Sequence, residues 1–161
     1  MNPIVVVYYS RTGKTRAVAE RLAEILGSDI EEIRETVSRS GPLGFIRAGR
    51  DAMAKKESTL ATQHSTTGRQ VIVLGMPVWG FNPPPAIRSY LKAADLKEPK
   101  VCGFATMDGS GADKTLEVVS SMVPGGLALR LGLKKPKPVS AKLELALKEW
   151  AGKIKELLPR G

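Results

Sequence analysis

Cysteine and histidine are almost missing from this 161-residue chain, which has one of each, Cys102 and His64. A single cysteine excludes an internal disulfide framework and a zinc site built on several thiolates. The neighbours of Cys102 are apolar, so we expect a buried and unreactive thiol within a strand. His64 lies in a polar stretch, where we expect a solvated loop residue rather than a ligand or a general base.

Long apolar runs are also missing. No segment approaches the roughly 20 residues that span a bilayer, and the N-terminus lacks the basic start of a signal peptide, so a cytoplasmic protein is expected. Aromatic residues make up only 5% and hydrophobic residues 42% of the chain. Leu, Ile and Val must therefore form the core, and the size suits one domain over residues 1–161.

Acidic residues are outnumbered, with 16 Asp and Glu against 25 Lys and Arg, which gives a formal net charge of +9. Such a charge could attract nucleic acid, an anionic membrane surface, an acidic protein or a phosphorylated ligand. The charge alone does not choose among these partners.

The hydrophobic pattern is more informative. Apolar and β-branched runs predict strands, and we place five of them at 4–9, 29–34, 71–74, 100–106 and 127–131. Helical periodicity predicts helices between and after them, at 14–26, 43–56, after Pro85, at 113–123 and after Ser140. This alternation implies right-handed crossovers and an α/β fold, with a parallel sheet covered by helices on both faces.

Ligands of open parallel sheets bind beyond the carboxyl ends of the strands, and the first loop at such an end is suited to an anion. Its residues are Ser10, Arg11, Thr12, Gly13, Lys14 and Thr15. The loop leads directly into a helix start, where main-chain N–H groups are unpaired and the helix dipole favours negative charge. Three hydroxyls around a glycine suit a phosphate monoester, whereas simple N-capping needs only one hydroxyl.

Two further loops suit the planar part of a ligand. The loop after 71–74 places Trp79 among Gly and Pro residues, where its indole offers a flat surface for stacking or simply packs. The loop Thr106–Gly111 is rich in small residues, which let backbone amides approach a ligand or merely form a flexible connection. Because all three loops follow strand ends, we expect them to form one pocket.

Two nucleotide-binding motifs would offer another interpretation, but each lacks one required glycine. Gly13-Lys14-Thr15 reads as the end of a P-loop, but the first glycine of that motif would fall on Tyr8. Gly109 and Gly111 begin a dinucleotide fingerprint whose third glycine position holds Lys114.

In this order, the three loops resemble those of the short-chain flavodoxins and related FMN-dependent reductases. Ser10, Thr12, Gly13 and Thr15 match the family's phosphate loop, T/S-x-T-G-x-T. The second loop is similar to the family's first flavin-stacking loop, at Pro77, Val78, Trp79, Gly80 and Phe81. The third is similar to the second flavin loop, at Thr106, Met107, Asp108, Gly109, Ser110 and Gly111, but it lacks the aromatic residue that many members place there.

The resemblance implies a flavodoxin-like, doubly wound sheet of five parallel strands in the order 2-1-3-4-5. It implies one bound FMN, with the phosphate on residues 10–15 and the flavin ring between 76–82 and 106–111. The implied function is electron transfer, by a redox carrier or by a small oxidoreductase with a quinone-type or other acceptor. In the family, a carbonyl such as that of Gly80 can turn toward flavin N5.

The basic charge departs from the strongly acidic classical carriers, and it fits an acidic redox partner protein or a small anionic acceptor. The helix expected at 43–56 could form a third wall of the pocket or contact a second subunit, so a homodimer is possible. One alternative remains, a flavin-free binding module that meets nucleic acid or an acidic protein through Arg47, Arg50, Lys55 and Lys56. Nucleic acid is the less favoured partner, because charge runs are usually solvated faces.

Overall fold

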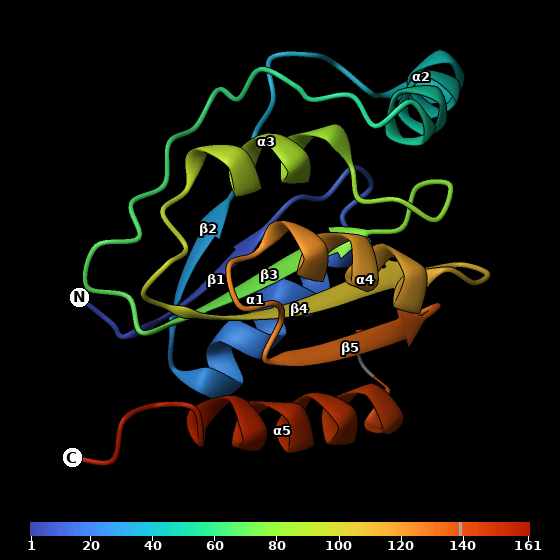
Figure 1. The fold of residues 1–161 in the computed structure, drawn as a ribbon. Helices are drawn as coiled ribbons and strands as arrows, with labels where there is room; N and C mark the ends of the chain where they lie inside the picture. The colour runs from blue at the N-terminus through green and yellow to red at the C-terminus, as the bar shows by residue number, and fades with distance from the viewer. Residues whose placement is uncertain (139) are drawn as a thin grey trace.

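Five parallel strands form one sheet in the order β2-β1-β3-β4-β5 (Figure 1). They are β1 (Ile4–Tyr8), β2 (Asp29–Glu32), β3 (Val71–Pro77), β4 (Lys100–Met107) and β5 (Leu129–Lys134). The structure is a computed structural model that describes residues 1–138 and 140–161. Val6 lies opposite Val73, which in turn lies opposite Cys102, so the middle of the sheet is aliphatic. The predicted strand order is confirmed.

Helices cover both faces of the sheet, as Figure 1 shows. The five helices are α1 (Lys14–Leu26), α2 (Gly41–Met53), α3 (Pro85–Ala93), α4 (Ala112–Met122) and α5 (Ala141–Lys155). Alternate residues of β1 point to opposite faces: Val6 packs in a core with α1 and α5, and Val7 packs in a second core with α3 and α4. The continuous apolar run of β1 therefore serves two cores at once.

Most element boundaries differ from the expected ranges by one to three residues, and two of these differences have a clear backbone cause. Strand β5 begins at Leu129 rather than at residue 127 and continues to Lys134, since Gly125 and Gly126 form a turn with positive φ before it. Helix α2 ends at Met53 rather than at residue 56, because Lys55 takes a left-handed conformation (φ 55°).

The expectation of a solvated His64 is wrong. Its side chain is 7% exposed, and its Nδ1 lies 2.6 Å from a carboxylate oxygen of Glu31. The imidazole also meets the ring of Tyr90 edge-on at 5.9 Å. The His64 side chain of the loop before β3 thus packs between edge strand β2 and helix α3.

The chain between β2 and β3 leaves the sheet and returns to it as a pair of antiparallel segments. Glu35 and Leu60 form an isolated antiparallel bridge, and the N–H of Thr36 donates to the carbonyl of Thr59 at 3.0 Å. Helix α2 lies at the far end of this excursion and stands clear of the two helical layers (Figure 1). The excursion brings α2 to the edge of the sheet where the predicted loops lie.

None of the helices in the described part of the chain combines the length and the apolar character that crossing a bilayer requires.

Candidate functional site

A cleft of about 230 Å³ lies at the carboxyl ends of β1, β3 and β4, and all three predicted loops line it. The loops contribute Arg11, Thr12, Lys14, Thr15, Pro77, Val78, Trp79, Gly80, Thr106, Met107 and Asp108. Helix α2 adds a fourth wall with Phe45, Ala48 and Gly49, and Pro136 lies at the border. The remaining predicted residues, Ser10, Gly13, Phe81, Gly109, Ser110 and Gly111, are outside this lining.

The first loop presents a helix start to the cleft. Gly13 is the N-cap of α1 with a φ of 95°, and no side chain caps the helix there. Main-chain N–H groups of the first turn therefore need another acceptor, such as an anion or water. Ser10 faces the loop itself, because its hydroxyl accepts a 3.0 Å hydrogen bond from the N–H of Gly13.

The threonines of the first loop divide their roles. Thr12 lines the cleft and is exposed. Thr15 is buried, and its hydroxyl lies 2.8 Å from that of Thr106 at the end of β4. The three side chains thus do not converge on one point: Ser10 bonds within the loop, Thr15 joins the first loop to the end of β4, and Thr12 lines the cleft.

Two basic side chains of the first loop reach across the cleft. The ammonium of Lys14 lies 3.0 Å from the carboxylate of Asp108 in the third loop, in an exposed pair of small energetic value. Arg11 turns toward α2, where its guanidinium donates to the carbonyls of Arg39 (2.7 Å) and Gly41 (3.0 Å) and lies over the ring of Phe45. Both cations line the cleft, together with the carboxylate of Asp108.

Trp79 forms the aromatic part of the wall and is fixed from two sides. Its ring meets Tyr9 edge-on, with centroids 5.5 Å apart, and the guanidinium of Arg39 lies 5.5 Å from its centroid. The N–H of Val78 donates to the carbonyl of Thr106 at 2.9 Å, which ties the second loop to the third. The indole is therefore held in place before any ligand arrives.

The tip of the second loop is a tight hairpin. Trp79 and Asn82 exchange both main-chain hydrogen bonds at 3.0 Å, while Gly80 and Phe81 have φ angles of 56° and 63°. Two positive φ angles define a type I′ turn, and a bulky residue such as Phe81 is strained in that conformation. The amide of Asn82 donates to the carbonyl of Gly80 at 2.8 Å.

A close approach of the second and third loops requires the glycine at 111. A Cβ built on Gly111 would lie 2.5 Å from the ring of Phe81, and the φ of this glycine is 105°. Phe81 and Gly111 thus join the two loops outside the cleft lining.

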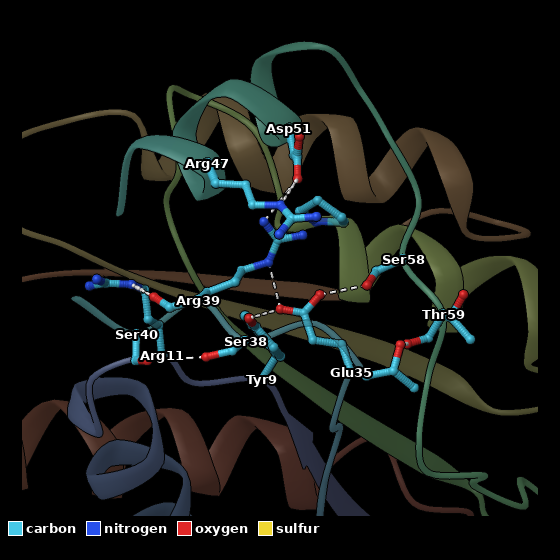
Figure 2. Close-up of polar contacts among 12 residues, drawn as sticks. Tyr9, Arg11, Glu35, Ser38, Arg39, Ser40, Arg47, Asp51, Ser58 and Thr59 are labelled. Atoms are coloured by element: carbon cyan, nitrogen blue, oxygen red, sulfur yellow. Dashed lines mark hydrogen bonds and ion pairs between the residues drawn. The ribbon is translucent and has the colours of Figure 1, made fainter. Parts of the chain in front are cut away.

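A buried polar network supports the cleft from beneath α2 (Figure 2). Glu35 accepts hydrogen bonds from Arg39 Nε (2.6 Å), from Ser58 Oγ (2.6 Å) and from the hydroxyl of Tyr9. Arg39 also donates to Asp51 of α2 at 3.0 Å. The side chains of Arg39 and Glu35 are only 5% and 4% exposed, so this is an ion pair in a largely water-free environment.

The network shifts the pKa values of Asp51, Arg39 and Tyr9. Burial works against both charges, but the ion pair with Arg39 outweighs it and lowers the pKa of Asp51. Hydrogen bonds to Glu35 and Asp51 likewise outweigh burial and raise the pKa of Arg39. Burial, together with Glu35, raises the pKa of Tyr9. Asp51 and Arg39 therefore keep their charges near neutral pH and Tyr9 stays neutral, and the network holds α2 against β1 and Trp79.

Sequence reasoning missed the small residues of α2 and the network beneath it. Gly44, Ala48 and Ala52 are buried four residues apart, a spacing that could have indicated a close-packed face. No local pattern marked Glu35 and Arg39, because their partners lie on separate segments. Cys102 is buried as expected, and burial raises its pKa to about 12, which makes the thiol unreactive. Within the described residues, no group of His, Cys, Asp and Glu could hold a metal ion.

Comparison with known protein families points to the same fold as this geometry. A family profile named flavodoxin matches residues 3–154, nearly the whole chain. The chain belongs to the flavodoxin family. No curated protein sequence matches it.

Solved structures share the flavodoxin fold at low sequence identity. A candidate flavoprotein from Bacteroides uniformis is 21% identical with a TM-score of 0.77, over 92% of this chain and 97% of that one. A flavoprotein from Lactobacillus acidophilus, in complex with FMN, is 20% identical with a TM-score of 0.67, over 82% of this chain and 93% of that one. Oxidised flavodoxin 2 from Bacillus cereus is 16% identical with a TM-score of 0.59, over 96% and 99%.

Proposed function

We propose that this flavodoxin binds one FMN in the cleft and transfers electrons through it, either as a redox carrier or as a small reductase. The observation that carries the proposal is the cleft itself, which has an electropositive helix start at one end and a fixed indole in its wall. The family, and the FMN bound by the Lactobacillus acidophilus relative, support this choice of cofactor. When bound, FMN supplies the electron-accepting ring, and the chain positions it.

The residues present fit a phosphate monoester at the first loop. Main-chain N–H groups of the first turn of α1 and the hydroxyl of Thr12 would donate to the phosphate oxygens. Lys14 adds positive charge on the same loop and releases Asp108 at little cost, because their pair is exposed. Thr15 shapes this loop through its bond with Thr106.

The other walls fit a planar ring. Pro77, Val78 and Trp79 supply apolar and aromatic surface, and Phe45 of α2 lies across from them in the same cleft. Such surfaces exclude water from one side of a ring and leave polar main-chain groups to meet its edge. Gly80 offers its carbonyl at this edge once the amide of Asn82 releases it.

The charge of the site bears on the partners. Negative charge gained by a ring on reduction is stabilised by nearby cations, and Arg11 and Lys14 line this cleft. We therefore propose a less negative potential than that of acidic carriers, with a quinone-type acceptor favoured and an acidic redox protein as the alternative partner.

Titration of the apo-protein with FMN and with riboflavin, followed by flavin fluorescence, tests the proposal. We expect FMN to bind more tightly than riboflavin, since only FMN carries the phosphate. Thr12→Val should weaken FMN binding by about 10- to 100-fold, the value of one hydrogen bond to a charged group, and leave riboflavin binding unchanged.

Thr67→Val is the matched control, because Thr67 is an exposed threonine outside the cleft. It should leave both affinities unchanged. Equal affinities of the wild-type chain for FMN and riboflavin would refute the phosphate role of the first loop. No binding of either flavin would leave the flavin-free binding module as the better interpretation.

A further inference from the structure

The outer face of α2 is more apolar than its buried face. Gly44, Ala48 and Ala52 face inward, whereas Leu43, Phe45, Ile46 and Met53 are 82%, 67%, 64% and 67% exposed. We call these four residues the α2 outer face. They are half of the exposed large hydrophobic side chains in the described part of the chain, gathered on one helix of 13 residues. Exposed large apolar side chains gathered on one short helix mark a candidate interaction site.

The orientation of α2 is fixed, so the exposure is built in. A Cβ on Gly44 would lie 2.2 Å from the backbone of Arg39, which leaves no room for a larger residue on the inner side. Asp51 anchors the same side to Arg39. A rotation that buried Phe45 or Ile46 would break both contacts.

Positive charge surrounds this apolar face. Arg47, Arg50, Lys55 and Lys56 are exposed on α2 or just after it. Asp51 is the carboxylate nearest to Arg47 (3.9 Å) and to Lys56 (3.6 Å), and Arg39 already pairs with it. The partner of the α2 outer face must therefore accept both apolar side chains and excess positive charge.

We propose that the α2 outer face docks on an anionic membrane surface, with Leu43, Ile46 and Met53 entering the headgroup–acyl boundary, Phe45 at the border with the cleft, and the surrounding Arg and Lys meeting anionic lipids. This combination of side chains is typical of helices that lie in a membrane interface. A second copy of the chain would present the same cations and be repelled. Nucleic acid would bind the cations through its phosphates but would leave the protruding aliphatic side chains exposed to water. A specific protein interface needs about 20 residues a side, whereas a fluid bilayer needs no complementary shape.

Docking in this way would have a consequence for the cleft. Phe45 belongs both to the α2 outer face and to the cleft lining. The cleft mouth would therefore lie at the membrane surface, where apolar acceptors such as quinones partition. This consequence rests on the proposed function, but the docking itself does not require a flavin.

Co-sedimentation with vesicles of phosphatidylcholine, with and without phosphatidylglycerol, tests the proposal on the full chain with and without FMN. We expect binding only to the anionic vesicles, and its loss in about 1 M salt, where the Debye length is about 3 Å. The double variant Leu43→Ser/Ile46→Ser should bind roughly tenfold or more weakly, and neither residue lines the cleft. Arg50→Gln/Lys55→Gln should weaken binding in the same direction.

Matched controls lie on α5, on the opposite face of the sheet (Figure 1). Leu145 is 60% exposed there, and Leu145→Ser should not change vesicle binding; nor should Lys142→Gln/Lys153→Gln. Equal losses in the α5 variants, or binding that survives Leu43→Ser/Ile46→Ser, would overturn the proposal. A wild-type dimer in solution that dissociates in the Leu43→Ser/Ile46→Ser variant would also overturn the proposal, and it would assign the face to a second copy of the chain. Binding to soluble poly-glutamate without binding to vesicles would overturn the proposal too, and it would assign the face to an acidic protein. Flavin titration of the same samples reports the proposed function separately.

Discussion

Replacing Arg39 by Met tests the buried network from which α2 and the cleft derive their geometry. The substitution keeps an aliphatic chain but leaves Glu35, 4% exposed, without its cation. The hydroxyls of Tyr9 and Ser58 still donate to Glu35, but they supply no charge. Removing one partner of a buried ion pair costs about 3–5 kcal/mol, out of a total stability of about 5–15 kcal/mol for a typical domain.

The measurement is urea unfolding followed by circular dichroism, with thermal unfolding beside it. A chain of this size loses about 2–4 °C of Tm per kcal/mol, so Arg39→Met should lower the Tm by roughly 6–20 °C. Arg34→Met is the control: Arg34 pairs with Glu32 on the surface, and its loss should cost about 0–1 kcal/mol.

A double variant separates the ion pair from simple loss of packing. Arg39→Met combined with Glu35→Gln removes both charges, so its loss should be smaller than the sum of the single losses by about 0.5–3 kcal/mol. Strict additivity, or a loss below about 1 kcal/mol for Arg39→Met, would refute the reasoning. FMN affinity measured well below the Tm should also fall in Arg39→Met, because Arg39 lies against the ring of Trp79.

Two further predictions concern the rest of the fold. Arg21 of α1 donates a hydrogen bond to Glu144 of α5 and lowers the pKa of Glu144 from 4.5 to about 2. Because the pKa is lowered in the folded chain, the ion pair contributes its full stability above the unfolded pKa of Glu144. This contribution is lost as the pH falls toward 2. Glu144→Gln should therefore be less stable than wild type at neutral pH and equally stable near pH 2, and a constant difference in urea midpoint across this range would contradict the assignment. Gly75→Ala should destabilise the chain by about 1–3 kcal/mol, since its Cβ would lie 2.2 Å from the buried ring of Phe104. Gly152 is an exposed position of α5 where a Cβ would meet nothing within 4 Å, so Gly152→Ala should instead stabilise the chain by about 0.5–1 kcal/mol. Similar effects of the two substitutions in thermal unfolding would show that the packing argument fails.

Local pattern was sufficient for the sheet and for the loops at its edge. The apolar run Ile4–Tyr8 can only be buried on both faces, and such a strand followed by a helix sets a parallel, two-sided sheet. Because the carboxyl ends of parallel strands share an edge, the loops after β1, β3 and β4 had to meet there. The convergence of these loops on one cleft follows from this rule.

Other features depended on contacts between residues far apart in the chain. From the sequence, Thr15 and Ser10 were equally good candidates for phosphate ligands. In the fold, the hydroxyl of Thr15 lies in hydrogen-bond contact with that of Thr106, and the hydroxyl of Ser10 accepts a hydrogen bond from the N–H of Gly13. The packing of His64 likewise depends on Glu31 and Tyr90, which belong to other elements. A side chain's hydrogen-bond partner is a property of the assembled fold, so its sequence neighbours do not reveal it.

The sequence by itself determined the alternation of strands and helices and the place of the cleft, because hydrophobic periodicity and chain connectivity are local properties. The order of the sheet was implied only by the resemblance to the flavodoxins. The tertiary structure alone decided that Glu35, Arg39 and Asp51 would form one buried network and that α2 would turn its large apolar side chains outward. The reason is steric and electrostatic: Gly44 fits against the backbone of Arg39, and a buried guanidinium requires carboxylates that only folding brings to it.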